Sequence, residues 1–190
     1  KQQGIPTVPK ERRIRPIHIW QSAAAILFLL LASSVYLSTV GTKAETDLLQ
    51  QYIPIAEMRS LTLPDGTKVQ LNSKSTLLYP QEFTGDSRSV FLLGEANFKV
   101  KPDKKRPFIV KSNDLQITAL GTEFNVSAYP ESQEIATTLI SGSIRVDYNN
   151  LTTSVILHPN EQFAYNRNNK KYDLSNPDMD DVTAWQRGKR

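Results

Sequence analysis

The stretch LQITALGTEFNVSAY, residues 115–129, decides the fold class, because two short runs of alternating apolar and polar residues flank a Gly-Thr pair. Alternation with a period of two is the pattern of a β-strand that buries one face. A glycine inside such a pattern marks a bend, a bulge or a close approach of two backbones. The stretch therefore predicts two strands joined at a corner made by Gly121 and Thr122.

The same arrangement occurs in LLGEANFKV at 92–100 and in ISGSIRV at 140–146. The three glycines, Gly94, Gly121 and Gly142, are 27 and 21 residues apart, a spacing too irregular for a repeat array. We interpret the three stretches as strand–corner–strand units, each bent at its glycine. Only the middle corner has a threonine directly after the glycine.

Residues 59–175 continue as about a dozen short alternating runs separated by turn signals such as Pro-Asp-Gly at 64–66. This spacing predicts an all-β domain, either a Greek-key-like sandwich or a short β-solenoid, and the pattern alone does not separate the two. Residues 43–58 are expected to be a short helical or irregular connector, and residues 176–190 a linker.

The basic excess of the chain lies at its N-terminus. The formal net charge is +4; residues 1–42 hold five basic residues and one acidic residue, whereas residues 43–190 hold eighteen of each. A neutral body lacks the basic surface expected of a nucleic-acid-binding domain. We therefore expect no direct nucleic-acid partner, and interpret the basicity as a topology signal.

Residues 17–42 contain no Asp, Glu, Lys or Arg and predict a single transmembrane helix. Trp20 and Tyr36 suit the two membrane interfaces, and the basic residues upstream place residues 1–16 in the cytoplasm. Everything after Lys43 then lies outside the cytoplasm. A cleaved signal peptide is the alternative, but the apolar region of a signal peptide is usually shorter than residues 17–42, and the polar segment before it is usually shorter than residues 1–16.

Residues able to carry catalysis or to bind a metal are few. The chain has no cysteine and two histidines, His18 at the membrane edge and His158 in a predicted turn. With so few histidines, the chain offers little support for a Ser-His-Asp triad or a histidine-rich zinc site. We expect no cofactor and no metal. The carboxylates that flank predicted strands show no spacing that pairs them: Glu95, Asp103, Glu123, Glu134 and Asp147.

Five stretches, taken in order, resemble the FecR family of bacterial transmembrane anti-sigma regulators. They are LPDGTKVQLNSKSTLLYPQEF at 63–83, RSVFLLGEANFKVKPDKKRPFIVKS at 88–112, LQITALGTEFNVSAYPE at 115–131, ATTLISGSIRV at 136–146 and VTAWQRGK at 182–189. The resemblance covers about residues 59–188, and the sequence of residues 71–80 is most similar to that of relatives from the Bacteroidetes. In HPNEQF, Asn160 stands where the family has glycine, and Asn tolerates the left-handed backbone of such a turn.

The resemblance implies an inner-membrane protein with a periplasmic β-domain. Its implied partners are a cytoplasmic extracytoplasmic-function (ECF) sigma factor, the signalling domain of a TonB-dependent outer-membrane transducer, and regulatory proteases. Residues 1–16 are shorter than the sigma-binding domain of the family, and the chain stops before the family's secretin/TonB-like domain. We therefore expect both domains to be absent from this chain.

The resemblance also implies chemistry at one corner, since some relatives cleave themselves between Gly and Thr in the matching LGT motif. Here the Thr122 hydroxyl would attack the Gly121 carbonyl, and the resulting ester would be hydrolysed by water. Glu123 is the nearest candidate base. The alternative is a glycine corner with no chemistry.

Two other functions remain open at this point. One is a membrane-anchored β-scaffold for envelope assembly or carbohydrate-uptake complexes, without sigma-factor regulation. The other is a membrane-anchored hydrolase with paired carboxylates, which no recognisable motif supports.

Overall fold

The computed structural model describes residues 25–36, 48–52, 54 and 57–187. The chain divides into two compact units, Lys1–Glu45 and Thr46–Arg190. In the first unit, residues 25–36 form a helix. No helix among the described residues has the length and apolarity needed to cross a membrane. Of the predicted span 17–42, the parts before 25 and after 36 lie outside the described residues, as does the segment 1–16, so both remain predictions.

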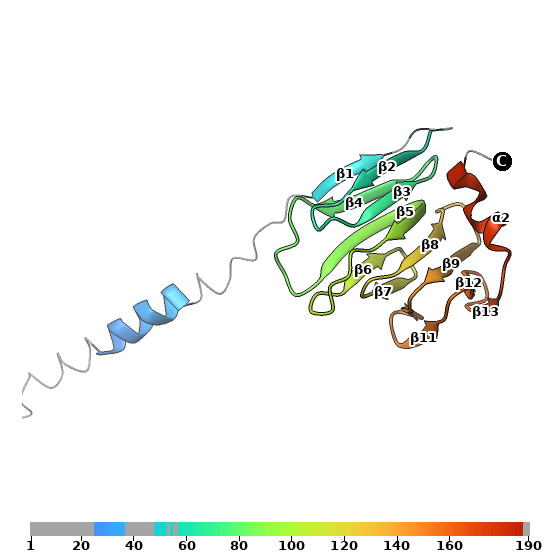
Figure 1. Ribbon diagram of the computed structural model, residues 1–190. Helices are drawn as coiled ribbons and strands as arrows, with labels where there is room; N and C mark the ends of the chain where they lie inside the picture. The colour runs from blue at the N-terminus through green and yellow to red at the C-terminus, as the bar shows by residue number, and fades with distance from the viewer. Residues whose placement is uncertain (1–24, 37–47, 53, 55–56, 188–190) are drawn as a thin grey trace, which may run out of the picture. The chain divides into compact units, whose positions relative to one another are not determined.

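The second unit is built almost entirely of strands (Figure 1). Two short helical turns follow the last strand, α2 (Met179–Thr183) and η1 (Ala184–Arg187). The strands are β1 (Leu48–Tyr52), β2 (Arg59–Thr62), β3 (Lys68–Leu71), β4 (Thr76–Pro80), β5 (Arg88–Lys99), β6 (Phe108–Lys111), β7 (Gln116–Ala119), β8 (Glu123–Ala128), β9 (Glu134–Ser141), β10 (Ile144–Tyr148), β11 (Thr153–Leu157), β12 (Gln162–Asn166) and β13 (Tyr172–Ser175).

These strands form one curled sheet with two halves that share β5. We call the order β11-β10-β7-β6-β5-β4-β1 half-sheet A, and the order β2-β3-β5-β8-β9-β12-β13 half-sheet B. Within the described strands every pairing is antiparallel except β5–β6. The predicted all-β fold class is confirmed, as one curled sheet whose antiparallel pairing differs from the parallel stacking of a typical solenoid.

Apolar side chains from both halves meet in one core. Phe98 on the half-B end of β5 lies 5.9 Å, between ring centroids, from Phe108 on β6 of half-sheet A. Tyr148 of half-sheet A lies 5.3 Å from Phe163 of half-sheet B in the same way. Along β5 every even-numbered residue is buried, as a period of two requires, and Asn97 is the one odd-numbered residue that is also buried.

The three glycine corners are the points where the chain passes between the half-sheets. Gly94 divides β5 into its A part and its B part, Gly121 joins β7 of A to β8 of B, and Gly142 joins β9 of B to β10 of A. All three have positive φ, at 97°, 150° and 93°. Glycine adopts such backbone angles without the steric cost that a Cβ imposes, so the predicted corners are confirmed.

Three strands and two helical turns differ from expectation. β1 lies in the segment expected to be a helical or irregular connector, and it pairs with β4 along its whole length. β13 extends half-sheet B beyond β12. The two predicted runs at 89–93 and 97–100 form the single strand β5. Residues 179–187, expected to be linker, form α2 and η1.

Candidate functional site

The Gly121 corner is closed by the loop 101–107, which connects β5 to β6. A Cβ added at Gly121 would lie 2.9 Å from the backbone Cα of Pro102. The Asp103 amide donates to the Leu120 carbonyl at 3.0 Å, and the Val100 amide donates to the Thr122 carbonyl at 2.9 Å. Backbone hydrogen bonds therefore hold the corner on both sides of the Gly121–Thr122 peptide bond.

Thr122 is wedged between two of the corners. Its side chain is buried, and its Oγ1 has no hydrogen-bond partner among the described residues. A Cβ added at Gly142 would lie 2.6 Å from Thr122 Cγ2. The methyl group thus fills the space beside Gly142, while the hydroxyl makes no hydrogen bond to the described residues.

The loop 101–107 is ordered by its own carboxylate. Asp103 Oδ1 accepts from the amides of Lys105 and Arg106, and Asp103 Oδ2 accepts from Arg106 Nε at 3.0 Å. The hydrogen bond from the Arg106 side chain is the main reason why the pKa of Asp103 lies below its ordinary value, because that bond favours the charged form.

A buried ion pair connects this loop to the Pro-Asp-Gly turn. Arg88 Nη1 lies 2.7 Å from Asp65 Oδ2, and the two side chains are 1% and 5% exposed. Arg88 also donates to the carbonyls of Lys101 at 2.8 Å and Arg106 at 2.9 Å. Asp65 in turn accepts from the Thr67 amide and hydroxyl. The turn at 64–66, the start of β5 and the loop against Gly121 are therefore held by one guanidinium group.

The corner places a nucleophile, Thr122 Oγ1, next to an electrophile, the Gly121 carbonyl. The candidate base Glu123, however, pairs with a different residue. Thr122 Oγ1 and the Gly121 carbonyl carbon are adjacent in the chain, so proximity needs no further folding. Glu123 pairs with Lys99 Nζ at 3.4 Å, and no hydrogen bond joins it to Thr122 within the described residues. Successive residues of a strand point to opposite faces, which explains why Glu123 faces outward while Thr122 faces inward.

The other candidate residues lie apart from one another. His158 is in the turn after β11, where its amide donates to Glu161 Oε2 at 2.8 Å, and Asn160 has the left-handed φ of 70° that was expected. Glu95 accepts from Asn72 and Asn125 at 2.7 and 2.9 Å. In the described part of the chain, no group of three potential metal ligands comes together.

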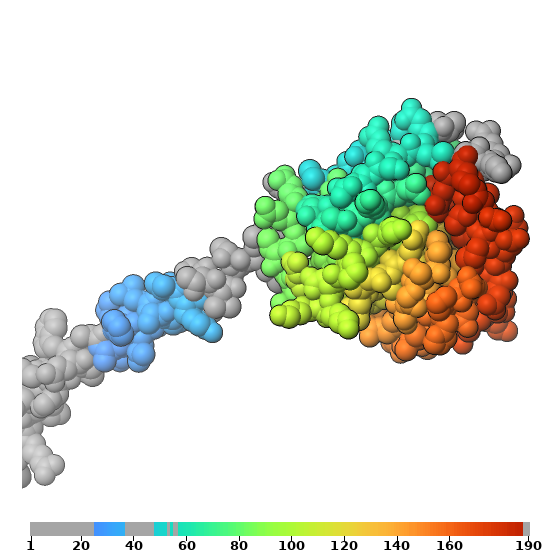
Figure 2. Space-filling model, in the orientation of Figure 1, coloured from blue at the N-terminus to red at the C-terminus, as the bar shows by residue number. Residues whose placement is uncertain are grey.

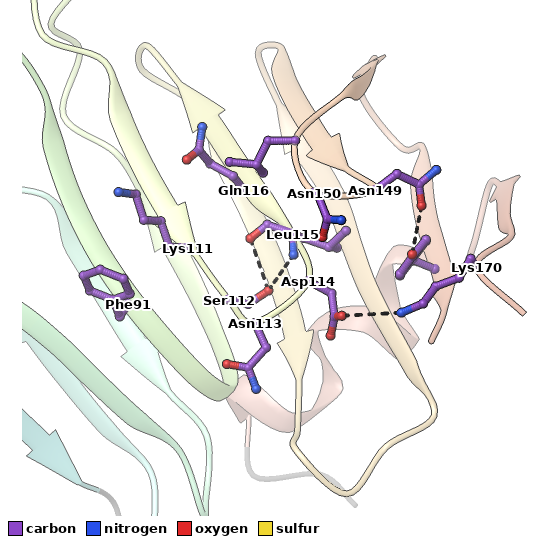
Figure 3. Close-up of a pocket in the computed structure, with 12 residues that line it drawn as sticks. Phe91, Lys111, Ser112, Asn113, Asp114, Leu115, Gln116, Asn149, Asn150 and Lys170 are labelled. Carbon is purple, nitrogen blue, oxygen red and sulfur yellow. Dashed lines mark hydrogen bonds and ion pairs between the residues drawn. The ribbon is translucent and has the colours of Figure 1, made fainter. Parts of the chain in front are cut away.

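A polar pocket of about 400 Å³ lies at one end of half-sheet A, where three turns converge (Figure 3). Asp114 accepts from Arg167 Nε at 3.0 Å, and its carboxylate lies 3.9 Å from Lys170 Nζ. Asn149 Oδ1 accepts from the Tyr165 hydroxyl at 3.0 Å. The consecutive residues 149–151 all have positive φ. The pocket was not predicted from the sequence, although Asn-rich turn signals occur at 112–114, 149–150 and 166–169.

Comparison with known proteins supports the fold and the motif order. Residues 53–145 match the family model FecR, described as FecR protein. Two crystal structures of a proposed anti-sigma factor from Parabacteroides distasonis ATCC 8503, at 2.50 Å and 1.65 Å, are similar to this chain. They show 39% and 38% sequence identity and TM-scores of 0.72 and 0.71, each over 74% of this chain.

The chain spans 65% of the length of those two structures. No curated protein matched it. The family match covers the corners at Gly94, Gly121 and Gly142, the buried ion pair and the loop 101–107, so it rests on the residues that build this architecture. Residues 53–145 of this chain belong to the FecR protein family.

Proposed function

We propose that this chain is the anchor and β-domain of an anti-sigma regulator. The observation that carries the proposal is the 39% identity to the Parabacteroides distasonis structure across a shared fold. The domain has features of an interaction module, with a closed apolar core and surface depressions that are lined largely by polar residues.

The finer part of the proposal concerns topology and partners. Residues 17–42 anchor the chain in the inner membrane, with the N-terminus in the cytoplasm and the β-domain in the periplasm. The regulator holds an ECF sigma factor on the cytoplasmic side. It receives its signal from the signalling domain of a TonB-dependent transducer, and regulatory proteases then release the sigma factor. The charge asymmetry of residues 1–42 supports this orientation.

Deletion of the gene, followed by transcript sequencing, tests the regulatory role. We expect one group of transcripts to change, and we expect that change to disappear when the corresponding ECF sigma factor is also deleted. Restoration with the intact gene and failure of restoration with a Phe98→Asp variant, which breaks the core, would link the effect to the folded domain. An unchanged set of sigma-dependent transcripts would refute the proposal and favour the scaffold alternative.

One binding measurement and one topology measurement test the finer part. Co-purification with the signalling domain of a TonB-dependent transducer is expected for the genuine partner and not for the signalling domain of an unrelated transducer. With a reporter fused after residue 45, which keeps the predicted span, a reporter that works only in the periplasm should be active and one that works only in the cytoplasm should be inactive. The reverse pattern would overturn the orientation.

We also propose that the Gly121–Thr122 bond undergoes a single self-cleavage. Thr122 Oγ1 attacks the Gly121 carbonyl carbon, the bond from that carbon to the Thr122 nitrogen breaks, and the hydroxyl proton passes to the nitrogen. Water then hydrolyses the ester to give a Gly121 carboxylate and a free Thr122 amino group. The buried, unpartnered Oγ1 is the observation that favours this step, because no competing hydrogen bond must be broken.

The cleavage is read as two fragments on a denaturing gel and as a new N-terminal Thr122 by mass spectrometry. Thr122→Ala should abolish it, and Thr122→Ser, which keeps a hydroxyl, should retain it. Thr137→Ala is the matched control, because Thr137 is also buried with an unpartnered Oγ1 but does not follow a glycine. An intact wild-type chain after days at neutral pH would refute the cleavage and leave the regulatory proposal untouched.

A further inference from the structure

The outer face of half-sheet B carries a row of neutral polar side chains at a single register. Each member lies opposite the next across neighbouring strands, so the row crosses all seven strands of the half-sheet. Thr138 Oγ1 donates to Gln162 Oε1 at 2.8 Å within it. The members of the row are Ser60, Gln70, Asn97, Asn125, Thr138, Gln162 and Ser175.

Two residues further along these strands, the paired positions on the same face carry charged side chains. These positions hold Thr62, Lys68, Lys99 and Glu123 side by side on β2, β3, β5 and β8. These residues line a groove of about 490 Å³ together with Gln70 and Asn97. Two lysines and one glutamate give the groove a positive balance. Glu123 is engaged by Lys99, and Lys68 has no ion-pair partner within the described part of the chain.

The C-terminal helical segment covers part of this face. Gln186 of η1 lines the same groove, although it follows β13 at the opposite edge of the half-sheet. Figure 2 shows the C-terminal segment reaching from the strands near β13 to those near β2 and β3. Neither α2 nor η1 contains a fully buried residue. The segment therefore lies against the sheet without entering the core.

This cover leaves polar groups without partners. Asn97 and Asn125 are 4% and 5% exposed although they face outward. Asn97 Nδ2, Trp185 Nε1 and Gln186 Nε2 are buried donors with no acceptor among the described residues. A buried donor without an acceptor costs free energy, so the closed arrangement carries that cost at each of these three groups. Asn97 Nδ2 and Gln186 Nε2 belong to residues that line the groove.

We propose that residues 178–187 form a displaceable cover and that the groove beneath docks a carboxylate-bearing segment of a protein partner. Lys68 and Asn97 Nδ2 receive the carboxylate, because the first is an unpaired cation and the second an unpaired donor at neighbouring register positions. Charge-assisted hydrogen bonds of this kind are shorter and stronger than neutral ones. The inference goes beyond the regulatory role proposed above and does not depend on cleavage.

Binding of a labelled ten-residue peptide of alternating Glu and Ser to the purified full chain tests this, with a Gln-and-Ser twin as the neutral control. Trp185→Gly removes the largest side chain of the segment, whose Nε1 is buried, and hydrogen exchange in β8 and β9 reports whether the domain stays folded. We expect this variant to bind the Glu peptide about tenfold more tightly than the unsubstituted chain. Adding Lys68→Gln should reverse most of the gain, whereas Lys104→Gln, an exposed lysine of the loop 101–107, should not.

Three results would overturn the inference. The first is equal affinity for the Glu and Gln peptides, or for an oligonucleotide of matched charge, since either would show non-selective attraction. The second is an unchanged affinity in a folded Trp185→Gly variant. The third is hydrogen exchange in residues 181–187 as slow as in β8, which would show that the segment does not leave the sheet. Each readout is independent of transcription, so failure here is distinguishable from failure of the regulatory proposal.

Discussion

Replacement of Arg88 by methionine should destabilise the β-domain more than any substitution on its surface. Methionine keeps the length and apolar stem of the side chain but leaves the Asp65 carboxylate buried, at 5% exposure, without its cation. Removing one partner of a buried ion pair costs about 3–5 kcal/mol. The carbonyls of Lys101 and Arg106 lose their donors in the same step, which places the expected loss toward the upper end.

The loss is large compared with the stability of a domain, which is typically about 5–15 kcal/mol. For a domain of this size it corresponds to a fall in Tm of roughly 6–20 °C, taking about 2–4 °C per kcal/mol. Urea denaturation of the full chain, followed by circular dichroism, measures the change in the free energy of unfolding. Because the strands remain the same, we expect the midpoint to shift while the slope stays constant.

Arg145→Met is the matched control, because the Arg145–Asp147 pair has a similar distance of 3.1 Å but a guanidinium that is 53% exposed. A surface pair of this kind contributes about 0–1 kcal/mol. Asp65→Asn combined with Arg88→Met should recover part of the loss, since the unpaired charge is then absent. A cost below about 1 kcal/mol for Arg88→Met, or no recovery in the double variant, would refute a buried charge pair as the link between turn and loop.

Three further predictions concern the corners and the loop 101–107. Gly94→Ala should lower the free energy of unfolding by about 2 kcal/mol or more, measured by urea denaturation, because Gly94 has a φ of 97° and the new Cβ would lie 2.7 Å from the Cα of Ser75. Gly85→Ala is the control: its Cβ would have nothing within 4 Å, and it should cost less than about 0.5 kcal/mol. The lowered pKa of Asp103 means that its contribution to loop order is present above the ordinary carboxyl pKa of about 4 and is lost as pH falls through the lowered value. Amide protection in the loop, taken as the intrinsic exchange rate at each pH divided by the observed rate, should therefore fall in acid, and Asp103→Asn should remove that pH dependence. Thr122→Val should change the free energy of unfolding by less than about 1 kcal/mol, because the hydroxyl it removes has no partner; a larger loss would reveal a hydrogen bond at Oγ1.

Strand positions were predictable where one face of the strand is buried, because burial imposes the alternating pattern. β8 is an example: Phe124, Val126 and Ala128 are fully buried and follow the period of two. β1 was missed because it has no buried residue, so its sequence LLQQY carries no alternation to detect. β13 is likewise an edge strand without a buried residue, and only its pairing with β12 defines it.

Most of the candidate site depends on contacts that no local pattern encodes. Asp65 and Arg88 are 23 residues apart, and a buried arginine has the same sequence signature as an exposed one. The contact of Pro102 with Gly121 follows from a loop closing over a corner formed later in the chain. The glycines were visible from the sequence, but the residues that fill the space beside them were not.

The three corners are alike in backbone and different in what occupies the space that a side chain would need. That space holds Ser75 at Gly94, Pro102 at Gly121 and Thr122 at Gly142. Thr122 therefore has a structural task, the filling of the third corner by its methyl group, that is separate from any task of its hydroxyl. The methyl alone would be supplied equally well by valine, which is β-branched and has no polar atom to leave unpaired. Thr137 also has a buried hydroxyl without a partner in the described part of the chain, so an unpaired hydroxyl alone does not distinguish Thr122. What distinguishes Thr122 is that this hydroxyl directly follows a glycine corner, and that combination is the reason why the Gly121–Thr122 bond is the first place to look for chemistry in this domain.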